Sequence, residues 1–238
     1  MKSEVPDLSE SDINYFESRF RPVTVFWRRT VSILHRIHSW ENHGKRTGRR
    51  KKFMEEVLPL SILGRNLECP GRLISCKYTG RSADADGILR MRGSLVPRQQ
   101  AEFPVEITTA EPEYEHLQRE ALLRKGSVFG DPNIRGEGSD QLGNREIINY
   151  PSVGHWTQNG TKELEHIARA LARKQGIVGK KEMILLINVR PENILQFEDW
   201  IFVVRESKEL ARASGFHDVY LVYIDQAFTF QLYGSGYR

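Results

Sequence analysis

The chain has 238 residues, of which 39% are hydrophobic, and this is enough to fill one sizeable core. No uninterrupted apolar run approaches the ~18 residues of a membrane span, and the acidic N-terminus does not resemble a secretory signal. We therefore expect a soluble, cytoplasmic protein with no membrane partner. Two cysteines, Cys69 and Cys76, are too few for a disulfide framework or a zinc site.

Positive charge is concentrated in one segment near the N-terminus, although the net charge is only +4. Between residues 28 and 52 a single acidic residue, Glu41, faces nine basic ones: Arg28, Arg29, Arg36, Lys45, Arg46, Arg49, Arg50, Lys51 and Lys52. Clustered cations bind phosphates by releasing counterions. The segment predicts a polyanionic partner, and we favour nucleic acid, with DNA first. An acidic protein or a membrane surface could also match this charge.

The N-terminal part of the chain is predicted to be helical. Apolar residues at helical spacing predict a helix over 22–40 with a basic face, followed by a glycine-punctuated cationic link over 44–52. A second, short helix is expected to begin at Phe53. We place a boundary near residue 50, which divides the chain into an N-terminal extension, 1–50, and a main domain, 51–238.

The main domain is predicted to alternate strands and helices. Glycines and a proline separate three short apolar runs that predict an antiparallel meander, with strands over 72–78, 87–92 and 102–109. A helix over 111–126 follows, and the glycine-rich stretch 127–160 predicts a long functional or mobile loop. The remaining predicted elements are a helix over 161–175, a strand over 183–189, a helix over 206–213 and strands over 219–224 and 228–233.

Two carboxylates lie in otherwise apolar, strand-like runs: Asp86, which precedes Gly87, and Glu106. Two anions about 4 Å apart repel by ~4 kcal/mol at the effective dielectric constant of a protein. Converging strand carboxylates therefore need a cation, a shared proton or a separation, and a divalent metal satisfies this need. Either residue alone has a simpler explanation, Asp86 as a turn residue and Glu106 as a solvent-facing one. Asp84 is expected to be a turn or capping residue.

The order helix, three strands, helix, strand, with Asp-Gly in the second strand and Glu in the third, resembles the PD-(D/E)XK restriction-endonuclease-like superfamily over residues 51–238. This resemblance implies an α/β fold: a central mixed β-sheet flanked by helices, built on a restriction-endonuclease-like αβββαβ core with an N-terminal helical extension. It also implies a nuclease that hydrolyses phosphodiester bonds. Its metal, Mg²⁺ or Mn²⁺, would be bound by Asp86, Glu106 and the carbonyl oxygen of Ile107.

The chain departs from the family pattern at Thr108, where the Glu-x-Lys motif has its water-polarising lysine. Strand alternation puts Glu106 and Thr108 on one face, roughly 6–7 Å apart. Threonine can orient a water molecule but cannot supply a positive charge. We expect Lys77 on the first strand, or Lys174 or Lys162 on the later helix, to replace the lysine.

The resemblance implies further participants. An acidic residue on the first core helix would be Glu55 or Glu56, and a polar residue on the helix after the third strand would be Gln118 or His116. A homodimer or larger complex is compatible with the family. Because of Thr108, the alternative is a catalytically inactive scaffold that binds nucleic acid or protein.

Overall fold

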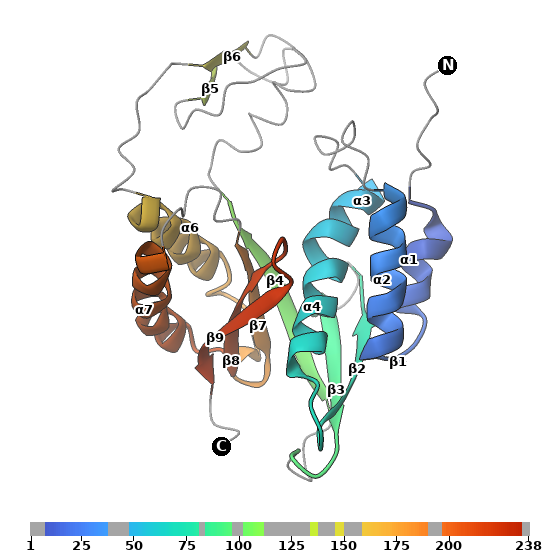
Figure 1. Cartoon of the computed structure of the whole chain (residues 1–238). Coiled ribbons are helices and arrows are strands. Elements are labelled where there is room, and N and C mark those ends of the chain that lie inside the picture. Colours follow the sequence, from blue (N-terminus) through green and yellow to red (C-terminus); the bar gives the residue numbers. More distant parts are fainter. Residues whose placement is uncertain are drawn as a thin grey trace, which may run out of the picture.

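The computed structural model describes residues 8–37, 48–80, 84–96, 102–111, 134–137, 146–149, 159–189 and 197–234. These residues form an α/β fold in which a seven-stranded mixed sheet lies between two groups of helices (Figure 1). The strand order is β1-β2-β3-β4-β7-β8-β9. The predicted α/β class, with helices flanking a central mixed sheet, is confirmed.

Pairing is antiparallel from β1 to β4, parallel from β4 through β7 to β8, and antiparallel again between β8 and β9. The three-stranded meander is therefore confirmed. The strands of this sheet are β1 (Arg21–Pro22), β2 (Leu73–Tyr78), β3 (Gly87–Arg92), β4 (Glu102–Ala110), β7 (Ile184–Val189), β8 (Asp218–Tyr223) and β9 (Phe228–Gly234). A separate antiparallel pair consists of β5 (Ile134–Glu137) and β6 (Glu146–Asn149).

Helices cover the two faces of the sheet in two groups, α1 to α4 on one side and α6 with α7 on the other (Figure 1). The helical segments are α1 (Glu10–Glu17), α2 (Val23–Ile37), α3 (Gly48–Lys52), the π-helical η2 (Phe53–Val57), α4 (Leu58–Leu67), α6 (Asn159–Arg173), the short 3₁₀ helix η5 (Lys180–Glu182) and α7 (Phe197–Ser214). The predicted helices over 22–40 and 161–175 are confirmed as α2 and α6, and the residues that follow Phe53 are helical as predicted.

Two helix predictions need correction. Residues 48–52 are helical and run directly into η2 and α4, so the cationic link is shorter than predicted. Lysine and arginine are good helix formers, which the glycines in this stretch obscured. Helix α7 begins nine residues before the predicted start at Glu206. Its first half carries Trp200 and Phe202, which pack against the hydrophobic core, and tertiary contacts of this kind override weak local propensity.

The two sheet faces belong to two hydrophobic cores. The first core lies under α1, α2 and α4 and includes Phe16 and Phe26 together with Leu89 and Val105 of the sheet. The second lies under α6 and α7. Along β4 the residues therefore alternate, and Val105 faces the first core while its neighbours in sequence face the opposite side.

The N-terminal helices are tied together at Asp12, which is only 1% exposed. Its carboxylate forms a capping box with Ser9 at the start of α1 and ion pairs with Arg29 and Arg36 of α2, at 2.8 and 2.5 Å. Burial acts to raise the pKa of Asp12, but the hydrogen bonds from Ser9 and the contact with Arg36 outweigh it, so the pKa lies below its ordinary value. The carboxylate is therefore charged at neutral pH and fixes α1 on α2.

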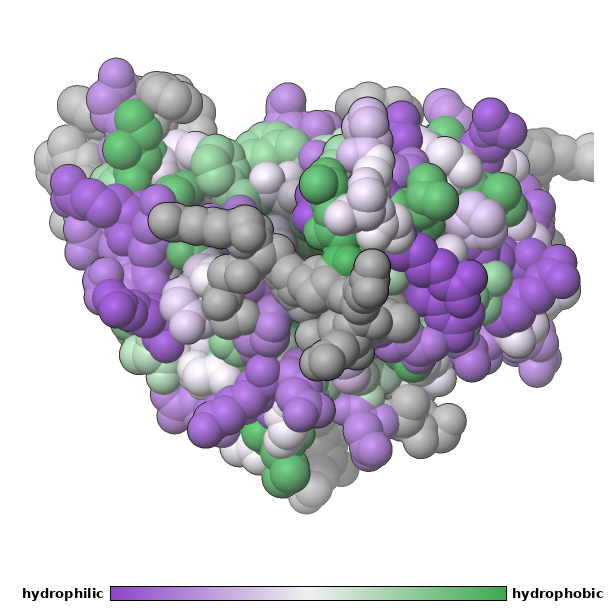
Figure 2. All heavy atoms as spheres, turned by 90° about the horizontal axis from the view of Figure 1, so that it is seen from below, coloured by the Kyte–Doolittle hydropathy of each residue, from purple (hydrophilic) through white to green (hydrophobic). Residues whose placement is uncertain are grey.

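The surface in Figure 2 is mostly hydrophilic, and hydrophobic residues gather there in small, separate patches. Within the described ranges, no helix combines the length and the apolar character that crossing a lipid bilayer requires.

Candidate functional site

The register of β3 and β4 brings the two predicted carboxylates together. Gly87 pairs with Val105 in this antiparallel ladder, so Asp86, one residue before Gly87, lies opposite Glu106. Val105 faces the first core, and both carboxylates therefore lie on the other face, the side of α6.

The surroundings of Asp86 disfavour the charged form of its carboxyl group. Burial and the nearby charge of Glu106 raise the pKa of Asp86 to about 6, and Glu56 acts in the same direction. A hydrogen bond of 2.8 Å from the backbone N–H of Ile107, and the charge of Lys174, oppose this shift without cancelling it. Asp86 and Glu106 are thus close enough to repel each other, which is the condition under which a bound cation is stabilising.

Close packing against α4 explains why a glycine, Gly87, follows Asp86. A Cβ atom placed on Gly87 would come within 2.6 Å of Cδ2 of Leu60 on α4, much closer than side chains pack. The glycine thus lets α4 press directly on the start of β3. This contact fixes the backbone next to Asp86 from the opposite face of the sheet.

Ile107 contributes its backbone to the site. Its side chain faces the first core, while its N–H points toward β3 and binds Asp86. In an antiparallel pair a residue directs its N–H and its carbonyl toward the same neighbouring strand, so the Ile107 carbonyl also points toward the β3 side. The β3–β4 ladder has already ended there, at Gly87. The carbonyl oxygen therefore points toward the end of β3 that carries Asp86.

Lys174 is the lysine that the fold brings to this pair. Its Nζ lies 2.5 Å from Oε1 of Glu106, and both side chains are largely buried, with 24% and 13% exposed. Lys174 follows the last residue of α6, Arg173, whose guanidinium donates a hydrogen bond of 2.6 Å to the carbonyl of Thr109. This bond anchors the end of α6 on β4 and holds Lys174 in place.

Neither of the other two predicted lysines forms an ion pair with Asp86 or Glu106. Lys162 is twelve residues before Lys174 on α6, which is about 18 Å along the helix axis. Lys77 pairs with Ile88 in the β2–β3 ladder, one side-chain row away from Asp86 on the same face. Thr108 shares the side of β4 that carries Glu106 and is 9% exposed.

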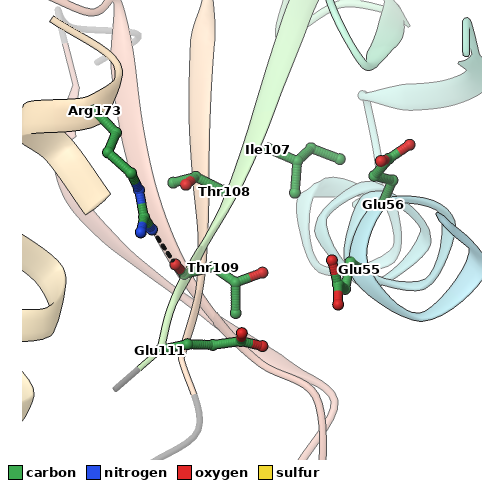
Figure 3. A pocket seen from close by; sticks show the side chains of 7 residues that line it. All are labelled: Glu55, Glu56, Ile107, Thr108, Thr109, Glu111 and Arg173. Carbon is green, nitrogen blue, oxygen red and sulfur yellow. Dashed lines mark hydrogen bonds between the residues drawn. The ribbon is translucent and has the colours of Figure 1, made fainter. Parts of the chain in front are cut away.

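A cavity of about 250 Å³ lies at the end of β4; Glu56 and Ile107 line it, whereas Asp86, Glu106 and Lys174 do not. Figure 3 shows the side chains that line it: Glu55, Glu56, Ile107, Thr108, Thr109, Glu111 and Arg173. The lining carries three carboxylates and one guanidinium, so its formal charge is negative and favours cations. Of the two predicted helix glutamates, Glu56 is the one whose charge raises the pKa of Asp86, and its carboxylate accepts a hydrogen bond from the Tyr78 hydroxyl. Burial and Glu56 raise the pKa of Tyr78.

Much of the predicted nucleic-acid-binding segment forms contacts within the protein. Besides the Arg29 and Arg36 pairs with Asp12, Arg49 lies 3.5 Å from Glu10, Lys51 lies 3.8 Å from Glu55, and Arg50 donates a hydrogen bond to the Ile37 carbonyl. Arg28 and Lys52 form no ion pair with a described residue. The segment is thus partly neutralised by the helices around it.

Several predicted residues lie outside the described ranges, namely Lys45, Arg46, His116 and Gln118, together with most of the expected loop over 127–160. Asp84 is exposed in the bend that leads into β3, as a turn residue would be. Tyr78, Glu111 and Arg173 lie at or next to the site and were not predicted from the sequence. Arg173 could have been found, because it is adjacent to a predicted lysine at a helix end.

Comparison of the chain with protein-family models, curated proteins and solved structures found no match. Among the described residues, no group of three or more His, Cys, Asp or Glu side chains is arranged to hold a metal ion. The groups that meet at the site are the carboxylates of Asp86 and Glu106 and the backbone of Ile107. Oxygen donors of this kind suit Mg²⁺ or Mn²⁺, which complete their coordination with water and phosphate.

Proposed function

We propose that the chain is a metal-dependent nuclease that hydrolyses a phosphodiester bond of nucleic acid. The observation that carries the proposal is the meeting of Asp86, Glu106 and Lys174 at the point where β3 separates from β4. Structural ion pairs also perturb pKa values, but here a perturbed carboxylate, a second carboxylate and an ammonium lie beside a cation-favouring cavity.

The order of elements supports the finer fold assignment. Apart from the β5–β6 pair and the short η5, the succession α4, β2, β3, β4, α6, β7 follows the αβββαβ order of the PD-(D/E)XK core, with β2–β4 antiparallel and β7 parallel to β4. The two motif positions fall at the start of the second strand and within the third. In this reading Lys174 at the end of α6 takes the part of the lysine that Thr108 replaces.

Each residue has a separate task in the proposed reaction. Asp86, Glu106 and the Ile107 carbonyl would hold Mg²⁺, which lowers the pKa of water and neutralises charge on phosphate oxygens. Lys174, fixed by Glu106, presents a positive charge and proton donors toward the attacking water or a phosphate oxygen. The Thr108 hydroxyl can accept a hydrogen bond from that water and orient it.

One observation favours a second candidate, a scaffold without catalytic activity. The ammonium of Lys174 neutralises Glu106 directly, and such an ion pair can take the place of a metal in a former active site. In that case the chain would bind nucleic acid or protein without cleaving it.

The two candidates are separated by a cleavage assay with labelled duplex DNA, single-stranded DNA and RNA in Mg²⁺, Mn²⁺ or EDTA. We expect cleavage with metal, none in EDTA, and a loss of at least about a thousand-fold for Glu106→Gln, because a metal ligand is removed. Asp84→Asn, which alters a nearby exposed carboxylate, is the matched control and should cleave normally. Equal cleavage by wild type and Glu106→Gln would refute the proposal.

A further inference from the structure

One face of the β2–β4 meander is much less covered than the other. On the side of the first core, Cys76, Leu89 and Phe103 are 0% exposed. On the opposite side, the face that carries Asp86 and Glu106, the side chains are half-buried or exposed. They are Leu73, Ser75, Lys77, Ile88, Arg90, Arg92, Glu102 and Pro104, which we call the open strip.

The open strip has defined dimensions. Arg92 lies six positions after Asp86 along β3, which is about 20 Å at the rise of a strand. Three strands span two strand spacings, or about 10 Å. The strip is therefore long and narrow, and the carboxylate pair lies at one of its ends.

The charge of the strip is mainly positive. Lys77, Arg90 and Arg92 face a single anion, Glu102, in the rows beyond the carboxylate pair. Lys77 and Arg92 form no ion pair with a described residue; Lys77 is half-buried and Arg92 is exposed. A chain of phosphates is the complementary partner.

The planar guanidinium group of Arg90 is held in a fixed orientation. Its Nε and Nη2 both donate to Oε1 of Glu102, at 2.9 and 2.5 Å, and its guanidinium carbon lies 3.7 Å from the centre of the Phe20 ring. The side chain remains 28% exposed. A guanidinium fixed in this way is a surface on which a nucleic-acid base can stack.

Apolar side chains lie between the cations. Ile88 and Pro104 occupy the row next to the carboxylates, and Leu73, which is 66% exposed, lies in the last row. Duplex DNA presents its phosphates outward and hides its base faces, so it offers nothing to such side chains. Unpaired bases do, and proteins that bind single strands combine a cationic track with stacking side chains.

We propose that the open strip binds single-stranded nucleic acid, which lies along the strands with one phosphate at Asp86 and Glu106. This proposal rests on the proposed function for the site at the end of the strip. It names the substrate class of that site, and it assigns substrate binding to β2–β4 in place of the N-terminal basic segment.

Fluorescence anisotropy of the full-length chain in EDTA tests the proposal without requiring cleavage. The probes are a fluorescein-labelled 12-nucleotide thymidine strand and a labelled 12-base-pair duplex. We expect the single strand to bind at least about tenfold more tightly than the duplex. Lys77→Glu and Arg92→Glu should each weaken single-strand binding by about tenfold, because each removes a phosphate contact and adds repulsion. Arg212→Glu, an exposed charge reversal on α7, should have no effect.

Arg90→Lys isolates the contribution of stacking to single-strand binding, because lysine keeps the positive charge but lacks the planar guanidinium group. Weaker single-strand binding with an unchanged thermal melting curve is the expected result. Preference for the duplex would overturn the proposal, and so would loss of binding with Arg28→Glu on α2 while Lys77→Glu and Arg92→Glu bind normally. Binding by the strip in a chain that never cleaves would instead remove only the catalytic assignment, so the two failures are distinguishable.

Discussion

Asp86→Asn is expected to abolish cleavage and, at the same time, to make the metal-free protein more stable at neutral pH. The folded protein holds the pKa of Asp86 at about 6, above the ordinary value of 3.8 for an aspartate, because of burial and the charge of Glu106. Ionising this carboxyl therefore costs the folded state about 2–3 kcal/mol relative to the unfolded chain. Asparagine removes the charge and keeps an oxygen that can accept the Ile107 N–H.

The pH dependence gives the sign of this effect. Between pH 4 and pH 6 the folded protein binds the Asp86 proton more tightly than the unfolded chain does, so the contribution of Asp86 to stability falls as the pH rises through this window. The stability gained with Asp86→Asn should thus be near zero at pH 4 and reach about 2 kcal/mol above pH 7. Urea unfolding at pH 4 and pH 7.5 in EDTA measures it, with Asp84→Asn as the exposed control. An Asp86→Asn variant that is less stable than wild type at pH 7.5 would contradict the geometry described.

Lys174→Ala is expected to reduce the turnover rate by about 10²–10⁴-fold while leaving metal binding intact or stronger. The variant removes the positive charge that acts on the reacting groups, and it also frees Glu106 from a competing cation. Lys162→Ala on the same helix, about 18 Å away, is the matched control and should keep full activity. Rate measurements at saturating substrate separate this effect from substrate binding.

The double variant Lys174→Ala with Thr108→Lys tests whether the charge can return to the position used by the family. Thr108 lies on the same side of β4 as Glu106, so a lysine there should reach the same site and restore part of the lost rate. Full activity of Lys174→Ala alone would show that this lysine has only a structural role.

The meander and the meeting of the two carboxylates were predictable because both depend on short-range patterns. The alternation of apolar and polar residues predicted the strands, and Gly87 indicated that β3 begins directly after Asp86. The choice of Lys174 was not predictable, since it depends on how the end of α6 docks on β4 through Arg173 and Thr109. The sequence left three lysines open, and only the packing distinguishes them.

The basic segment is conspicuous in the sequence, but the fold directs several of its charges to partners within the protein. Its charges stand out in the sequence, yet Arg29 and Arg36 are tied to Asp12, which lies far from them along the chain. The open strip gives no comparable signal, because its three cations are spread over two strands. Which face of the meander is covered depends on where the helices pack, and local periodicity does not contain that information.

Calorimetric titration of the chain with Mn²⁺ at pH 7.5 tests most directly whether Asp86 and Glu106 hold a divalent cation. We predict saturable binding at one or two sites in the wild type, loss of that binding in Asp86→Asn and Glu106→Gln, and unchanged binding in Asp84→Asn. Absence of binding in the wild type, or equal binding in all four proteins, would contradict a metal centre between β3 and β4.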